Sequence, residues 1–330
     1  MQNTENLVFE GGGVLGFAYV GVVKALQEKN ILKNCIGFAG SSAGAITAAL
    51  LACGATSETL EKALESLDAT ELFDSSCFTV ANLYRLWSVG GWTRGTKLEQ
   101  LIGKMLGNLC RGNEAITFQQ IFEQFGKKLI VTGTCLETKR TEYFSQENCP
   151  RMSVALAVRI SAGYPCVYPM IEHLNYHWWD GGIGDNYPIH VFDKKSEKHS
   201  KERIPNMKTI GFKLVSELKG HKKIPKAPLV IENVHDAVMS VGNMILDMSR
   251  LIHVHKIDWK RSVLIDVGTI SAMNFHITHV EKKFLIDNGY RATLDFIDAA
   301  SSLNSPDADS SLNSPDADSS LNSPDADSSQ

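Results

Sequence analysis

A serine flanked by glycines constrains the fold of this chain more than any other feature of its sequence. Gly40 and Gly44 stand two positions before and two positions after Ser42, in the pentapeptide Gly-Ser-Ser-Ala-Gly. Apolar residues at 35–39 predict a preceding strand, and the small, apolar residues at 43–53 predict a helix that is buried on all sides. Glycines at these two positions are needed where a strand turns sharply into a helix, because the two elements then pass very close to each other. The pattern predicts a strand–turn–helix unit with Ser42 at its tip, and the alternative is a glycine-rich helix entry capped by a serine.

Strand-like and helix-like segments alternate throughout residues 1–300. The expected strands are at residues 7–9, 35–39, 129–133, 143–144, 209–215 and 263–267, and the expected helices are at residues 16–27, 43–53, 154–160 and 280–297. Alternation of this kind indicates an α/β domain, a three-layer α/β/α sandwich with a largely parallel central sheet, and we expect it to occupy residues 1–300. Two segments interrupt the alternation. Residues 74–95 are rich in aromatic side chains, and residues 194–226 hold eleven Lys or Arg against three Glu.

Residues 301–330 differ in composition from the rest of the chain. The nine residues Ser-Ser-Leu-Asn-Ser-Pro-Asp-Ala-Asp occur three times in succession, with one leucine and one alanine in each unit. So few apolar side chains cannot offset the entropy lost on ordering the chain, and we expect a disordered tail. The unit has no glycine, which a calcium-binding repeat of this length needs for its turns. The tail holds six of the 37 acidic residues, which leaves 31 acidic against 33 basic residues in the domain and no overall charge that indicates nucleic acid as a partner.

The seven cysteines favour a reducing compartment. They are scattered, odd in number and never spaced as Cys-x-x-Cys, which argues against a disulfide framework and against a structural zinc site. The first six residues are polar and lack the features of a secretory signal peptide. The longest apolar stretches, at residues 14–23 and 43–55, are too short to span a bilayer. We therefore expect a cytoplasmic protein that contacts membranes only peripherally.

A second glycine cluster, at Gly11, Gly12 and Gly13, follows the first expected strand. With Gly16 it matches the Gly-x-Gly-x-x-Gly pattern of dinucleotide-binding proteins, but such sites also need an acidic residue at the end of the second strand, where this chain has Gly-Ser-Ser. Consecutive glycines also expose successive backbone N–H groups, and the following helix directs its positive end to the same place. The oxyanion of an acyl-transfer intermediate needs such donors, each worth about 3 kcal/mol of transition-state stabilisation. We therefore predict that the three glycines form an oxyanion hole.

A serine nucleophile needs a partner that accepts its proton. None of the ten histidines stands out as that partner from its sequence context. Asp180 is the better candidate, because two tryptophans precede it and Gly181 and Gly182 follow it, so that a glycine-rich turn brings the carboxylate close to another element. Apolar surroundings raise the pKa of a carboxylate toward that of a useful base. An ordinary hairpin turn is the alternative explanation of the Asp-Gly-Gly sequence.

Three motifs, in this order, resemble those of the patatin-like phospholipase family. The sequence Glu-Gly-Gly-Gly at residues 10–13 resembles the family's oxyanion loop, the pentapeptide at residues 40–44 its nucleophile elbow, and Asp-Gly-Gly at residues 180–182 its dyad motif. Weaker similarities lie at residues 117–118, 154–162, 168–169 and 186–189, so that the resemblance covers most of residues 5–300. The chain departs from the family pattern at Leu15, where the family usually carries Arg or Lys.

The resemblance implies a patatin-like fold and a serine hydrolase with a catalytic dyad of Ser42 and Asp180, without a triad histidine. It implies hydrolysis of fatty acyl esters of phospholipids or lysophospholipids, an activity of the phospholipase A or lysophospholipase type, through an acyl-enzyme. The oxyanion is then held by Gly11, Gly12 and Gly13. The resemblance implies no metal ion and no cofactor for this chemistry, and it leaves an activating protein partner open.

Two alternatives from other functional classes stay open. In the first, the protein transfers the acyl group to an acceptor other than water. In the second, it is a lipid-binding or scaffolding protein whose catalytic site is no longer active, and the intact Ser42 and Asp180 argue against this alternative.

Two segments are candidates for membrane contact. The aromatic residues 74–95 are a candidate lid or wedge, because Trp and Tyr favour the headgroup region, and the basic residues 194–226 are a candidate surface for anionic lipid. Ordinary helix packing and a solvated loop are the respective alternatives.

Overall fold

The computed structural model describes residues 3–67, 96–165, 167–195, 203–216, 244, 255–274 and 276–302. The strands are β1 (Asn6–Phe9), β2 (Gly37–Gly40), β3 (Lys128–Cys135), β4 (Arg140–Ser145), β5 (Ile171–His173), β6 (Tyr176–Asp180), β7 (Lys194–Lys195), β8 (Arg203–Ile204), β9 (Thr209–Val215) and β10 (Ser262–Asp266). The α-helices are α1 (Ala18–Glu28), α2 (Ala43–Ala52), α3 (Ser57–Ser66), α6 (Thr96–Leu109), α7 (Phe118–Phe125), α8 (Val154–Ser161), α9 (Gly182–Asp185) and α11 (His279–Ser302). The 3₁₀ helices are η1 (Gly13–Phe17), η2 (Leu32–Asn34), η3 (Ile189–Phe192) and η4 (Asp258–Arg261).

Several predicted features lie outside the described residues. They are the aromatic segment 74–95, parts of the basic stretch 194–226, and the repeat tail beyond residue 302. The expectations for a membrane-contacting lid, for a basic surface and for a disordered tail therefore stay predictions. Within the described ranges, no helix combines the length and the hydrophobicity that crossing a bilayer requires.

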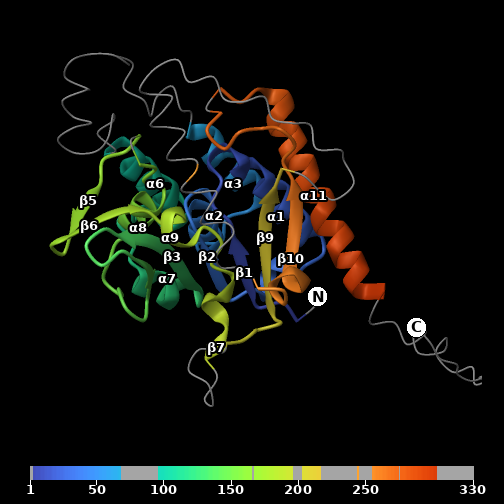
Figure 1. The fold of residues 1–330 in the computed structure, drawn as a ribbon, viewed down its shortest axis with the longest axis horizontal. Coiled ribbons are helices and arrows are strands. Elements are labelled where there is room, and N and C mark those ends of the chain that lie inside the picture. Colours follow the sequence, from blue (N-terminus) through green and yellow to red (C-terminus); the bar gives the residue numbers. More distant parts are fainter. Residues whose placement is uncertain are drawn as a thin grey trace, which may run out of the picture.

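The central sheet is mixed, with a parallel core. Its strand order is β10-β9-β1-β2-β3-β6-β5, and β4 pairs with β3 outside this path. The pairs from β10 to β3 are parallel, whereas β4 and β6 pair with β3 in the antiparallel sense, as does β5 with β6. Figure 1 shows β1, β2, β9 and β10 side by side in the centre of the molecule, with β5 and β6 extending to one side. The predicted α/β fold with a largely parallel sheet is confirmed.

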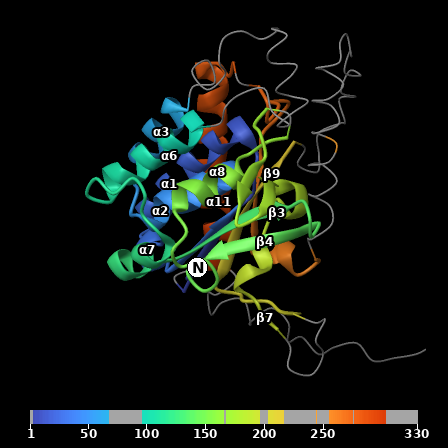
Figure 2. The same cartoon turned by 90° about the vertical axis from the view of Figure 1, so that its left-hand side faces the viewer.

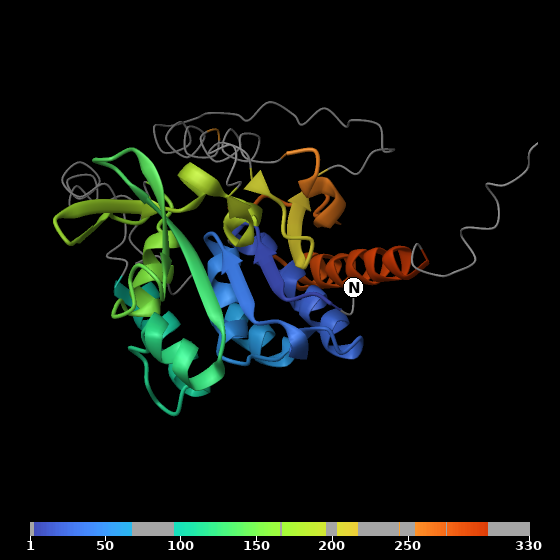
Figure 3. The ribbon, with the colours of Figure 1, turned by 90° about the horizontal axis from the view of Figure 1, so that it is seen from below.

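The helices form layers of unequal thickness on the two faces of the sheet. Helix α2 packs against β1, β2 and β3, α8 packs against β3 and α6, and α11 packs against α1 and β10. Figure 2 shows these longer helices gathered on one side of the strands. The shorter α9 and η3 also pack against the sheet. Helix α9 contacts β3 and β4, and η3 contacts β1, β2 and β9. Figure 3 shows them, in yellow-green, on the side opposite to α1, α2 and α7.

The elements around the two glycine motifs follow the sequence pattern closely, with one difference. Every residue of α2 is buried, as its small and apolar composition predicts. The helix predicted to start at residue 16 instead begins as η1, and α1 follows it from Ala18. The tighter 3₁₀ turn arises because the Leu15 N–H donates to the Gly12 carbonyl at 3.0 Å, and the Val14 N–H to the Ala272 carbonyl at 3.0 Å. The glycine cluster is thereby drawn toward a segment that is distant in sequence.

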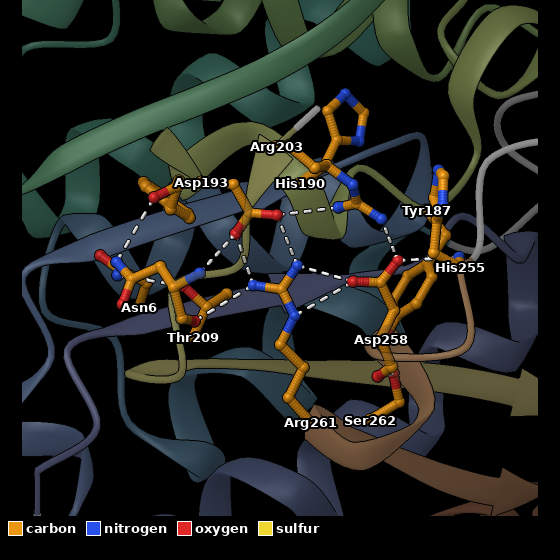
Figure 4. Close-up of polar contacts among 12 residues, drawn as sticks. Asn6, Tyr187, His190, Asp193, Arg203, Thr209, His255, Asp258, Arg261 and Ser262 are labelled. Atoms are coloured by element: carbon orange, nitrogen blue, oxygen red, sulfur yellow. Dashed lines mark hydrogen bonds and ion pairs between the residues drawn. The ribbon is translucent and has the colours of Figure 1, made fainter. Parts of the chain in front are cut away.

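A buried ionic network lies near the amino-terminal end of β10 (Figure 4). Arg261 is held between Asp193, at 2.5 and 2.7 Å, and Asp258, at 2.7 Å. Arg203 adds a second guanidinium, with ion pairs to both aspartates. Buried charges are costly unless they are paired, and here each of the two carboxylates contacts both arginines. The network ties η4 and the segment at β8 to the end of η3, before the amino-terminal end of β10, whereas Ser42 follows the carboxyl-terminal end of β2.

Candidate active site

Ser42 stands in a strained turn between β2 and α2. Its φ of +50° and ψ of −122° lie in a region that residues with a side chain rarely adopt, and such strain is found mainly at functional sites. A Cβ on Gly40 would overlap the backbone of Gly44, and a Cβ on Gly44 would overlap the carbonyl of Phe9. Both glycines are therefore required by the close crossing of strand and helix. The predicted strand–turn–helix unit is present, with Ser42 at its tip.

The strained conformation of Ser42 is supported from α8. The Ser42 N–H donates to the hydroxyl of Ser161 at 3.0 Å, and the Ser161 hydroxyl lies 3.4 Å from that of Thr132 on β3. Ser161 and Thr132 are fully buried. The sequence assigned no role to either residue, because the contact joins positions 119 residues apart and depends on the packing of α8 against β3.

Asp180 ends β6 with its side chain almost fully buried, at 1% exposure. Its carboxylate accepts the Gly182 N–H at 2.7 Å, and the Ser42 hydroxyl lies near enough to favour the charged form of the carboxylate. Burial raises the pKa of Asp180 to about 7, while the Gly182 N–H, the Ser42 hydroxyl and the charge of Arg159 oppose the shift. The direction agrees with the prediction from sequence. A carboxylate with this pKa exchanges protons near neutral pH, which is the requirement for a general base.

Gly181, directly after Asp180, lies where the chain leaving β6 passes very close to β3. A Cβ on Gly181 would overlap the side chain and backbone of Thr132, so only glycine fits at this position. The chain then enters the helical turn α9, which begins at Gly182. The alternative explanation of Asp-Gly-Gly as a hairpin turn is therefore wrong, since the sequence leads from a strand into a helix.

The glycine loop between β1 and η1 lies beside Ser42 and Asp180. The Gly11 N–H donates a hydrogen bond to the carbonyl of Asn186 at 3.0 Å, so this N–H is not available to a substrate oxyanion. This corrects the prediction that three glycine amides serve as donors. In the described part of the chain, the N–H groups of Gly12 and Gly13 have no such acceptor. These two amides are the remaining candidate donors.

The start of the loop is anchored by a buried ion pair. Glu10 is completely buried, and its carboxylate pairs with Lys213 on β9 at 2.8 Å and accepts the Leu214 N–H at 2.7 Å. Lys213 also lies 4.8 Å from the centre of the Tyr187 ring. The side chain of Leu15, where the family usually carries a basic residue, is buried in the hydrophobic core. The Glu10–Lys213 pair was not predicted, because its two members are 203 residues apart in the sequence.

One cavity of about 140 Å³ joins these groups. Ser42, Asp180 and the three glycines of the loop line it together with Asn186. The rest of its described wall is mostly apolar, from Val14, Phe17, Ala43, Ile46, Leu64, Leu67, Leu98, Ala162, Tyr164, Tyr168, Ala272 and Met273. An apolar cavity with a few convergent polar groups is typical of a ligand site, and this one suits an apolar chain with one reactive polar group.

The described histidines and possible metal ligands lie elsewhere. No histidine is among the described residues that line the cavity. His177 pairs with Glu137 at 2.6 Å, and His190 lies 3.3 Å from the Tyr143 hydroxyl. Across the ranges that the structure describes, no three His, Cys, Asp or Glu side chains are grouped so that they hold a metal ion. Asp180 is the acidic side chain among the described residues that line the cavity with Ser42.

Comparison with known proteins identifies the family of this chain. The model of the patatin-like phospholipase family matches residues 7–193. Uncharacterized protein R571 of Acanthamoeba polyphaga mimivirus is 31% identical over 293 residues, which are 87% of this chain and 92% of that protein. Probable lipid hydrolase 463L of Invertebrate iridescent virus 6 is 30% identical over 205 residues, 60% of this chain and 67% of that protein.

A solved structure supports the same conclusion at the level of the fold. The crystal structure of VipD from Legionella pneumophila aligns with a TM-score of 0.58 at 20% sequence identity, over 90% of this chain and 67% of that chain. The segment matched by the family model includes the glycine loop, Ser42 and Asp180, and it spans more than half of the sequence. The chain belongs to the patatin-like phospholipase family.

Proposed function

We propose that this protein hydrolyses fatty acyl esters of phospholipids or lysophospholipids, with Ser42 as nucleophile and Asp180 as general base. The observation that carries the proposal is that Ser42, in its strained turn, and the buried carboxylate of Asp180, whose pKa is about 7, line one cavity with the glycine loop. Family membership and the name of the iridescent virus relative support lipid hydrolysis in general. The apolar wall of the cavity supports a substrate with an acyl chain.

The first half of the proposed reaction forms an acyl-enzyme. Asp180 accepts the proton of the Ser42 hydroxyl while the Ser42 oxygen attacks the ester carbonyl carbon. The carbonyl oxygen becomes an oxyanion that the N–H groups of Gly12 and Gly13 stabilise. When the tetrahedral intermediate collapses, Asp180 returns the proton to the departing alcohol oxygen, and the acyl group stays on Ser42.

The second half releases the fatty acid. A water molecule gives its proton to Asp180 and attacks the acyl carbon, and a second oxyanion forms at the same two amides. Collapse of this intermediate breaks the bond to Ser42, whose oxygen regains the proton from Asp180. One ester bond and one water molecule are consumed, and one fatty acid and one alcohol are produced.

Membrane contact and location form a separate part of the proposal. An enzyme of this class reaches its substrate at a lipid surface, so we propose that the protein acts in the cytoplasm and binds membranes peripherally. The candidate surfaces, residues 74–95 and 194–226, can be tested by sedimentation with liposomes of increasing anionic lipid content. Binding that is independent of anionic lipid would remove the basic stretch as the cause.

The decisive test compares two neighbouring serines. Ser41 is completely buried, and its hydroxyl has no hydrogen-bond partner in the described part of the chain, so Ser41→Ala removes no hydrogen bond. We expect Ser42→Ala to abolish fatty-acid release from mixed phospholipids, measured by mass analysis of the products, and Ser41→Ala to retain it. Retained activity in a folded Ser42→Ala protein would defeat the proposal. Added lysophospholipid or alcohol acceptors in the same assay distinguish hydrolysis from acyl transfer.

A further inference from the structure

A short segment connects the proposed base with the glycine loop. It starts at Asp180, whose carboxylate accepts the Gly182 N–H, continues through α9 and reaches Asn186. Asn186 then binds Gly11 twice. The Asn186 backbone carbonyl accepts the Gly11 N–H at 3.0 Å, and the Asn186 side-chain amide donates to the Gly11 carbonyl at 2.9 Å. The two halves of the site are therefore held together within seven consecutive residues.

The side-chain hydrogen bond has a consequence for the neighbouring amide. The Gly11 carbonyl and the Gly12 N–H belong to the same planar trans peptide, and in such a unit they point in opposite directions. A donor that holds the Gly11 carbonyl therefore turns the Gly12 N–H away from itself. The Gly13 N–H is set in the same way, because the Leu15 N–H holds the Gly12 carbonyl at 3.0 Å. Each of the two candidate oxyanion donors thus has its direction fixed through the carbonyl of its own peptide.

The contact between Asn186 and Gly11 is tightly built. Asn186 is 3% exposed, and a Cβ on Gly11 would overlap its side-chain oxygen. Beyond the other end of the loop, the Val14 N–H is held by the Ala272 carbonyl, against which Gly13 also packs. Gly13 itself has a φ of +54°, so a residue with a side chain is disfavoured there. Without Asn186, the Gly11 peptide loses the side chain that fixes its rotation.

We propose that Asn186 is a positioning residue that aims the Gly12 N–H at the substrate oxyanion. This inference rests on the proposed function, because it assigns a task in the acyl-transfer step. Asn186 acts through the Gly11–Gly12 peptide, and its removal affects the transition state more than the bound ester. The expected signature is a lower kcat at a nearly unchanged KM.

The chain offers a closely matched control at the other end of β1. Asn6 is 7% exposed, its side-chain amide donates to the Thr209 hydroxyl at 3.2 Å, and a Cβ on Gly37 would overlap its side-chain oxygen. Figure 4 shows this contact beside the ionic network, and neither Asn6 nor Thr209 is among the described residues that line the catalytic cavity. Asn6→Ala therefore removes a buried asparagine of similar packing without touching the proposed machinery.

The experiment measures ester hydrolysis and labelling of Ser42 by a fluorophosphonate, whose phosphoryl oxygen occupies the oxyanion position after reaction. We expect Asn186→Ala to lower kcat and the labelling rate by about 10- to 100-fold, less than the loss of a whole donor, with KM changed less than about threefold. Asn6→Ala should change both rates less than about threefold while lowering the melting temperature by a similar amount. Equal rates for the two variants would overturn the inference.

Two further readouts keep the test decisive. Asn186→Asp preserves the size of the side chain and removes its donor, so it should show at least the same loss at the high-pH plateau even where Asn186→Ala fails to fold. The acid limb of the pH–rate profile of Asn186→Ala should stay at its wild-type position, since Asn186 is not among the groups that shift the pKa of Asp180. A shifted limb with an unchanged plateau would show that Asn186 acts on the base, contrary to the inference. Failure of the proposed function itself appears differently, as a wild-type protein whose Ser42 is not labelled.

Discussion

Asp180 and Asp258 are both almost completely buried, yet their surroundings shift their carboxyl groups in opposite directions. The donor groups that favour the charged form of Asp180 are neutral, the Gly182 N–H and the Ser42 hydroxyl, and burial raises its pKa to about 7. Asp258 contacts two arginines. Burial also disfavours its charged form, but the hydrogen bonds from Arg261, the His255 N–H and Arg203 prevail and hold its pKa below the ordinary value.

The difference separates a reactive carboxylate from a structural one. A buried carboxylate in contact with guanidinium groups stays charged, contributes to stability through its partners and takes up a proton only at low pH. A buried carboxylate with only neutral donors in contact retains an affinity for protons near neutral pH, at a cost in stability. The two groups belong to different strands of the sheet, since Asp180 ends β6 and Asp258 lies just before β10, with β9, β1, β2 and β3 between these strands. The effects of their removal should therefore be separable.

The largest expected effect is on activity, from Asp180→Asn. The amide has nearly the same shape but cannot accept the Ser42 proton, so we expect kcat to fall by about 10³-fold or more. The free energy of unfolding at pH 7 should not decrease, because a desolvated charge is removed. Steady-state kinetics and denaturant unfolding measure the two quantities. A variant that keeps a tenth of the wild-type kcat would show that another group accepts the proton.

The opposite result is expected from Asp258→Asn. This change leaves Arg261 and Arg203 without one of their two carboxylates, and breaking a buried ion pair from one side costs about 3–5 kcal/mol. We expect the free energy of unfolding to fall by that amount in urea titrations. The specific activity of the folded fraction should stay within a factor of about two. A stable variant with reduced activity would contradict the structural role assigned to the network.

The architecture and the proposed dyad were accessible from sequence, because their signals are local. Alternating strand and helix patterns predict the α/β sheet. The glycines around Ser42 predict the sharp turn in which its backbone is strained. Glycine is required at such crossings for steric reasons that act over a few residues. The pairing of Ser42 with Asp180 came from motif order and family resemblance, with no distance available to test it.

The supporting residues were not predicted, because their signals are not local. Ser161 meets Ser42 across 119 residues, and Asn186 meets Gly11 across 175. Asn186 was noted within a family motif but had no task, since only the fold brings its amide to the Gly11 carbonyl. The same contact occupies the Gly11 N–H, which is why the predicted set of three donors was too large. Among the residues of the ionic network, only Asp258 and Arg261 are close in sequence, and their spacing alone does not indicate burial.

A smaller effect concerns the pH dependence of stability. The pKa of Asp180 is about 7 in the folded state against 3.8 when unperturbed, so between these pH values the folded protein holds a proton that the unfolded chain has lost, and stability falls as pH rises. The free energy of unfolding of Asp180→Asn relative to wild type should therefore increase by about 2–3 kcal/mol from pH 5 to pH 7. For Asp258, with its lowered pKa, the contribution is present above the unfolded pKa and is lost as pH falls through the folded value. Parallel stability profiles of wild type and Asp180→Asn would refute the raised pKa.

The smallest expected effect tests why the two aspartates differ. Arg159, 2% exposed, is the cation whose charge opposes the raised pKa of Asp180, although it does not contact the carboxylate as the arginines contact Asp258. In Arg159→Met we expect the acid limb of the pH–rate profile to move to higher pH by up to about one unit, because the charged form of Asp180 loses a stabilising field. The high-pH plateau should be nearly unchanged, since Asp180 is then ionised in both proteins.

Arg159→Lys is the matched control for this shift. It keeps the positive charge near Asp180 but loses the planar group that lies 4.8 Å from the centre of the Tyr168 ring. An effect of charge therefore predicts an acid limb close to that of the wild type in Arg159→Lys and a displaced limb in Arg159→Met. Equal displacement in both variants would assign the effect to packing around Tyr168, and the distinction between Asp180 and Asp258 would then rest on burial and neutral donors alone.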